Sequence, residues 1–278
     1  MNRKEIYDAI GERVLAALNE GTVPWAKPWK SLTPRNLISK KPYRGINTIL
    51  LGLSKFNSPY WLTFKQAKSL GGHVKRGERG TQIIFWKFFN KDEDEEDEKN
   101  SYAVCRMYTV FNLEQTEGVN ESRIPVIRQN EDDPIEAAEA AVEAWEGKPV
   151  IKVTLAGMRA FYAPTEDSVN VPSLAQFTGA GEYYQTLFHE LAHSTGHPER
   201  LNRFEVGARP SKESYSKEEL VAEISSAFIM GILGIDYNVR NTEAYVKGWA
   251  SFVKDNKEEV VKSASQAQKV VDMILGVE

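Results

Sequence analysis

The sequence has very little cysteine and histidine: one cysteine, Cys105, and four histidines occur in 278 residues. A single thiol excludes an internal disulfide framework and a cysteine-based zinc finger. Long apolar runs are also missing, because no stretch reaches the length that spans a bilayer. The N-terminus MNRKEIYDAIGERV is too charged for a secretory signal. These absences predict a cytoplasmic protein that does not enter a membrane.

Acidic residues are scarce in the first third of the chain. Residues 1–90 contain 16 Lys and Arg but only 5 Asp and Glu, a balance of +11. Because the whole chain has a net charge of −4, the remainder carries −15. Such a split indicates two modules with different partners. The basic part is a candidate for binding a polyanion.

The pattern of apolar, β-branched and turn-forming residues predicts mixed secondary structure in the basic part. Glycine and proline mark the ends of the segments. The expected elements are a helix over 3–20, a helix over 47–55, a short helix capped by Thr63, and a hairpin of strands 81–89 and 102–112 around an exposed acidic loop at 92–98.

The acidic part is predicted to contain one helix, then short strands, then further helices. The polar, irregular segment 119–134 is expected to be a linker. The expected elements after it are a helix from Pro134 to Gly147, strands near 150–153 and 159–162, an edge strand over 167–171, and helices over 183–194, over 216–233 and from Thr242 onward. The fold class predicted is therefore α+β in two domains.

The helix over 183–194 contains the motif His189-Glu190-Leu191-Ala192-His193. Side chains four positions apart lie on one helical face, so both imidazoles can reach one metal ion. Glu190 is rotated about 100° around the axis, where it can act as general base on a water that the metal activates. The bland alternative is a helix with two solvated histidines and an ordinary glutamate. The opposite side of the 183–194 helix is apolar, with Leu187 and Phe188, and this setting favours the metal site over that alternative.

A catalytic zinc usually has three protein ligands, so a third must come from elsewhere. Glu219 and Glu223 are four apart and share a helical face; one could bind the metal and the other could hold a ligand imidazole. Glu219 also has a structural explanation, because with Ser216 it would form an S-x-x-E capping box. The order of the two stays open. His197 is expected in a loop, because Gly196 ends the helix before it.

The basic part interleaves cations with aromatic residues, as single-stranded nucleic-acid binders do. The alternative is that the aromatic residues form the core and the lysines a solvated face. The charge of the segment favours DNA binding, and the candidate contacts are Trp25, Lys27, Trp29, Lys30, Lys41, Tyr43, Arg44, Trp61, Lys65, Lys75, Arg76 and Arg79.

Several motifs occur in an order that resembles one family. The strings VPWAKPW, YRGINTILL, WLTFKQAKSLGGHVKRGERGTQIIFWK and VFNLEQTEG resemble the N-terminal domain of ArdC-type antirestriction proteins, also found in TraC-like primases. YYQTLFHELAHSTGHPERLNR and EELVAEISSAF resemble the zincin-like domain of the same family.

The resemblance implies a domain over 1–118 that binds single-stranded DNA and a metallopeptidase-like domain over 135–278. It also implies protection of incoming mobile-element DNA from restriction. We expect one Zn²⁺, Mn²⁺ or other divalent ion per chain, and an unknown protein or peptide substrate. The alternative is a non-enzymatic DNA-binding or replication accessory protein whose metal site is structural.

Overall fold

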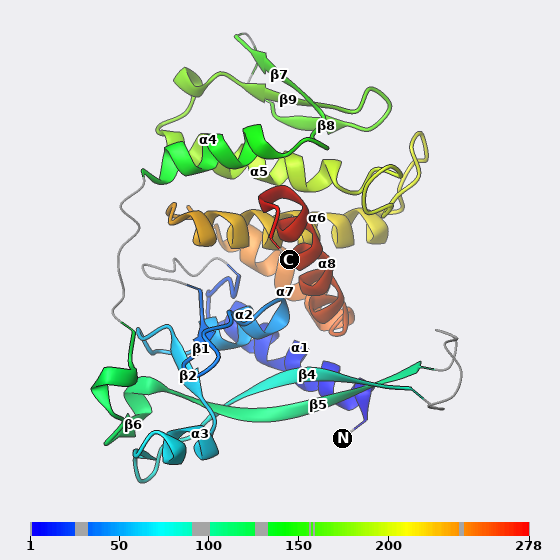
Figure 1. The fold of residues 1–278 in the computed structure, drawn as a ribbon. Coiled ribbons are helices and arrows are strands. Elements are labelled where there is room, and N and C mark those ends of the chain that lie inside the picture. Colours follow the sequence, from blue (N-terminus) through cyan, green and yellow to red (C-terminus); the bar gives the residue numbers. More distant parts are fainter. Residues whose placement is uncertain are drawn as a thin grey trace.

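The computed structural model describes residues 2–25, 33–90, 101–125, 133–155, 157, 159–238 and 242–277. The expected acidic loop at 92–98 lies outside the described residues. The fold is α+β, as predicted, and its long helices and the β4–β5 hairpin agree with the sequence pattern (Figure 1). The helices are α1 (Arg3–Asn19), α2 (Ile46–Gly52), α3 (Phe64–Ser69), α4 (Pro134–Ala144), α5 (Ala180–Ser194), α6 (Lys212–Leu233), α7 (Glu243–Asp255) and α8 (Glu259–Leu275). The strands are β1 (Arg35–Asn36), β2 (Tyr60–Leu62), β3 (His73–Val74), β4 (Thr81–Asn90), β5 (Ser101–Asn112), β6 (Thr116–Glu117), β7 (Val150–Thr154), β8 (Phe161–Ala163) and β9 (Ser168–Pro172).

The N-terminal unit is built on a four-stranded sheet in the order β1-β2-β5-β4. Strand alternation turns Ile84 and Cys105 towards the core that contains α1. The free edge of β4 is closed by Asn47 of α2, whose side chain accepts from Ile84 N at 2.8 Å and donates to Ile84 O at 2.7 Å. Thr63 is the N-cap of α3, as expected, and forms a capping box with Gln66.

The C-terminal unit stacks a three-stranded sheet, β7-β9-β8, on helices (Figure 1). Strand β9 lies in the centre, parallel to β7 and antiparallel to β8. The prediction of an edge strand here was wrong. Val169 and Val171 are fully buried against the helices, and Pro172 sits only at the strand's last position, where proline is tolerated.

One hydrophobic core continues through both units. Ile6, Ile10 and Val14 of α1 belong to the same buried cluster as Val253 of α7 and Val260 of α8. The first helix of the basic part therefore packs on the last helices of the chain. The division at residues 118 and 135 stays a prediction about domains, but the two units share buried surface.

The contact between α1 and the α7–α8 turn is very close at Gly11. A Cβ atom there would lie 2.5 Å from Lys257 Cβ and 2.8 Å from its Cα. Because backbone would have to move, we expect Gly11→Ala to destabilise the protein by about 1–3 kcal/mol. The shift in the urea-unfolding midpoint measures this.

Gly248→Ala is the matched control, since Gly248 also lies in a helix and nothing occupies the space within 4 Å of its Cβ position. Alanine should there stabilise the helix by about 0.5–1 kcal/mol. Equal midpoints for the two variants would contradict the close packing of α1 on this turn.

Candidate metal centre

The two imidazoles of the motif face each other on α5. Tyr184, Leu187 and Leu191 bury one side of this helix, which turns His189 and His193 to the opposite side. Their Nε2 atoms are 3.2 Å apart. The rings stand almost perpendicular, with centroids 4.8 Å apart. Each ring therefore directs its Nε2 atom to the same point.

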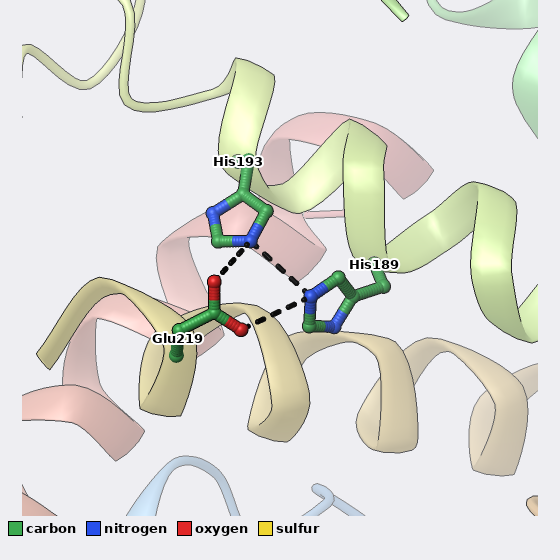
Figure 2. A group of neighbouring side chains, drawn as sticks. All are labelled: His189, His193 and Glu219. Carbon is green, nitrogen blue, oxygen red and sulfur yellow. Dashed lines mark hydrogen bonds and ion pairs between the residues drawn. The ribbon is translucent and has the colours of Figure 1, made fainter. Parts of the chain in front are cut away.

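Glu219 completes the group from α6, which packs against α5 (Figure 2). Its Oε2 lies 3.5 Å from His189 Nε2, and its Oε1 lies 3.5 Å from His193 Nε2. A tetrahedral zinc with bonds of roughly 2.0–2.1 Å separates its ligand atoms by about 3.3–3.4 Å. The spacing and the two-imidazole, one-carboxylate donor set therefore fit a divalent ion, and among the described residues only these three form such a group.

The structure separates the two glutamates that the sequence left open. Glu223 accepts a hydrogen bond from Tyr237 Oη at 2.7 Å and is not in the group. The expected capping box of Ser216 and Glu219 was wrong, because α6 begins one turn earlier with Ser211 as its N-cap. Ser216 is inside the helix and donates to Lys212 O at 3.0 Å. Glu219 is thus free of a capping role.

Glu218 is a site residue that sequence reasoning missed. Its Oε1 lies 3.4 Å from His193 Nδ1, the ring atom on the far side from the group. Arg203 donates to both carboxylate oxygens of Glu218, at 3.0 and 2.6 Å. Arg203 also donates to Ala192 O at 2.8 Å, on α5 itself. A fixed carboxylate behind a ligand histidine sets its tautomer and orientation.

The charges around His193 support this arrangement. Burial lowers the pKa of His193, but the hydrogen bonds that its ring donates to Glu218 and Glu219 outweigh this effect and raise that pKa to about 10. Burial opposes ionisation of Glu219 as well, yet its hydrogen bonds to both histidines hold its pKa well below the usual range. The site thus attracts positive charge.

The group opens into a cavity of about 990 Å³. Glu190 lines it, together with Phe161 and Tyr162 of β8 and Tyr215 of α6. A hydrogen bond with Glu219 raises the pKa of Tyr215 to about 12. The predicted base and a phenolic proton donor therefore border the same space as the two imidazoles.

A partly buried ion pair ties the sheet to the C-terminal end of α5. Arg200 donates to both carboxylate oxygens of Asp167, at 2.8 and 2.6 Å, and to Ser194 O at 2.9 Å. Tyr162 Oη of β8 donates to Asp167 at 2.7 Å. Asp167 adopts a left-handed backbone with φ 43°. These bonds fix β8 over the cavity. His197 lies in the turn after α5, where its Nδ1 accepts from Glu199 N at 3.3 Å.

We expect Glu218→Gln to weaken Zn²⁺ or Mn²⁺ binding by about 10- to 100-fold, the usual cost of losing an outer-shell partner. Glutamine keeps the shape but gives His193 and Arg203 no charge. The matched control is Glu213→Gln on the same helix, because the Glu213 side chain is 63% exposed. Calorimetric titration measures both. Unchanged affinity in Glu218→Gln would show that His193 needs no such support.

The predicted DNA contacts fall into three groups. Trp25, Tyr43 and Trp61 are 2, 8 and 2% exposed. Rings this covered cannot stack on bases, so that role was wrongly assigned to them: each one fills the core. Lys27, Trp29 and Lys30 lie outside the described residues. The remaining cations are all exposed: Lys41, Arg44, Lys65, Lys75, Arg76 and Arg79. Of these, Arg44 forms an ion pair with Asp272 of α8.

The fold and the site define a protein with a zincin-like metallopeptidase unit. Residues 137–266 match the family described as zincin-like metallopeptidase. Residues 4–111 match the N-terminal domain of anti-restriction factor ArdC. The crystal structures of the antirestriction ArdC protein from plasmid R388 are 35% identical to this chain, with a TM-score of 0.78. The metal-free form is matched over 96% of both chains, and the Mn(II)-bound form over 98% of this chain and 97% of that one. The chain belongs to the ArdC family of antirestriction proteins.

Other relatives contain a similar sequence within proteins of different lengths. An Escherichia coli protein named DNA primase TraC is 35% identical over 99% of this chain. The chain spans only 27% of that relative's length. The uncharacterized protein y4eC of Sinorhizobium fredii is 30% identical, over 96% of this chain and 91% of that protein. No helix among the described residues is long and apolar enough to cross a membrane.

Proposed function

We propose that this protein is a metal-dependent peptidase that also binds single-stranded DNA and protects incoming mobile-element DNA from restriction. The observation that carries the peptidase is the spacing of His189, His193 and Glu219, which suits a divalent ion bound at the edge of an open cavity. Family membership supports the antirestriction role. The Mn(II)-bound relative supports Mn²⁺ as one metal that such a site accepts.

Each side chain has a separate role. His189, His193 and Glu219 would hold the ion, which when bound supplies Lewis-acid polarisation and lowers the pKa of water. Glu190 takes the proton from the attacking water and passes it to the leaving amine. Tyr215 borders the same cavity and can donate a hydrogen bond to the oxygen on which negative charge develops.

The cavity suits an extended peptide. Strand β8 pairs with β9 along one edge, and its residues Phe161 and Tyr162 line the cavity. An extended segment placed there can pair with strand backbone, as peptides do when they add to a sheet edge. The Arg200–Asp167 pair holds that strand in place. This favours a protein segment in extended conformation as substrate.

A quenched-fluorescence peptide library incubated with metal-loaded protein tests the peptidase. We expect cleavage of some members by the wild type and none after the metal is chelated. A library left intact by protein shown to contain one ion per chain would contradict the peptidase.

Exposed cations support DNA binding by the N-terminal unit. Lys65 on α3 and Lys75, Arg76 and Arg79 between β3 and β4 lie on its surface. Polyphosphate contacts release counterions, so affinity for single-stranded DNA should fall steeply with salt. The shared core makes the whole chain the right sample for this measurement. A full-length protein with no affinity at low salt would exclude the DNA-binding function.

The second candidate is a non-enzymatic DNA-binding or replication accessory protein with a structural metal. The relatives named DNA primase favour it, because there a similar sequence is part of a larger protein. A structural zinc normally has four protein ligands, whereas the described residues offer three at this point. A Glu190→Gln protein, which should keep the metal and lose cleavage, decides between the two.

A further inference from the structure

The outer face of the β4–β5 hairpin exposes two large aromatic rings. Phe85 is 48% exposed and Tyr108 is 43% exposed. The two rings touch edge to face, with centroids 5.7 Å apart. Large aromatic side chains are usually buried, and a contacting pair left open to solvent marks a binding surface more often than a single ring does.

Strand register explains why these rings point outward. In β4, Ile84 is buried in the core with α1, so Ile83 and Phe85 point to the other face. Figure 1 shows α1 running along one side of the hairpin. On the other side, Ile83 and Val110 close a small core with Trp61. Beyond that core, the same face of the hairpin carries the exposed rings of Phe85 and Tyr108.

Basic side chains flank the rings on the same face. Arg106 is the cross-strand partner of Phe85, and Lys87 follows Phe85 by two positions, so both share its face. Both are exposed. The facing segments 81–87 and 104–110 contain no Asp or Glu. The face therefore combines two flat rings with two basic side chains.

We propose that Phe85 and Tyr108, with Arg106 and Lys87, form a platform on which the bases of single-stranded DNA stack. Flat rings accept any base, and neighbouring cations accept the phosphates. The ring of Tyr43 lies 6.5 Å from that of Phe85 and supports it from the core side. The platform supplies the stacking surface that the buried Trp25, Tyr43 and Trp61 cannot provide. It rests on the proposed DNA-binding function and names its contact surface.

The test uses full-length protein and a fluorescein-labelled oligothymidine, with affinity measured by anisotropy over a series of salt concentrations. We expect Phe85→Ala/Tyr108→Ala to bind at least about tenfold more weakly, because stacking contributes strongly to each bound base. Its salt dependence should match the wild type, because no charge is removed. Arg106→Ala should instead reduce the slope of log affinity against log salt by about one.

The matched control is Phe64→Ala. Phe64 is 47% exposed, stands at the start of α3 and contacts only the Lys68 cation in the described ring contacts. It should bind DNA as the wild type does. Phe85→Trp keeps a flat ring and should retain affinity, which separates stacking from any effect on the hairpin itself.

The outcomes distinguish the two levels of the proposal. Wild-type protein that binds no oligothymidine at low salt would overturn DNA binding as a function. Wild-type protein that binds, with a double variant within twofold of it, would overturn the platform and leave DNA binding in place. Loss of binding in the double variant, retained in Phe64→Ala and Phe85→Trp, supports the platform.

Discussion

Glu219→Gln is expected to weaken Zn²⁺ or Mn²⁺ binding by more than about 100-fold, beyond the range seen for outer-shell partners. Glu219 faces both imidazoles at 3.5 Å, and an amide oxygen cannot replace the charge that a carboxylate gives a divalent ion. Calorimetric titration, with metal content after dialysis as a second readout, measures the loss.

Glu223→Gln is the matched control on the same helix, four residues away. Its side chain accepts from Tyr237 Oη, and a glutamine oxygen can still accept that bond. Affinity should stay within a few-fold of the wild type. His197→Ala should behave in the same way, because His197 lies outside the group. If Glu223→Gln lost the metal and Glu219→Gln kept it, the assignment of the third ligand would be reversed.

Glu190→Gln is expected to keep one ion per chain and to lose peptidase activity by about 10²- to 10⁴-fold, the usual contribution of a general base. Glu190 borders the cavity but is not part of the metal group. The measurement is the rate of cleavage of a peptide from the library, with metal content determined on the same sample.

The same variant separates the two candidate functions. If Glu190→Gln protein still protects transferred DNA fully from restriction, proteolysis is dispensable for that protection. The result would then favour the non-enzymatic accessory protein. If the variant loses both peptide cleavage and protection from restriction while its affinity for DNA is unchanged, the peptidase is part of the function. His193→Ala, which should lose the metal as well, is the comparison in both assays.

Local sequence signals predicted most of the elements, because the reasons for them are local. Helical spacing predicted α1, Thr63 as an N-cap predicted the start of α3, and β-branched runs predicted the β4–β5 hairpin. Strand β9 was predicted at an edge of its sheet, whereas it lies in the centre. Its central position depends on pairing with β7 and β8, which no local pattern records.

The motif predicted two members of the site, and the packing of α6 on α5 selected the rest. Glu219 and Glu223 share a helical face, so only the crossing of the two helices decides which one meets the imidazoles. Glu218 could have been suspected as a carboxylate next to a ligand candidate. Its bond to Arg203 joins segments 15 residues apart, and nothing in the spacing showed it.

Amino-acid composition alone could not predict which aromatic residues are exposed and able to contact DNA. Trp25 and Trp61 have side chains that could stack on bases, but both are buried in the core. Burial of their apolar surface is favourable. The rings left at the surface are set by strand register, which turns Phe85 outward and Ile84 inward. A charge balance can therefore indicate a polyanion partner without identifying the residues that contact it.

The most direct measurement is anomalous diffraction from crystals of the protein loaded with Mn²⁺ or Zn²⁺. We expect one strong peak per chain, within about 2.0–2.2 Å of Nε2 of His189, Nε2 of His193 and a carboxylate oxygen of Glu219. A peak elsewhere, or a loaded crystal with no ion between these three side chains, would contradict the metal centre and the peptidase with it.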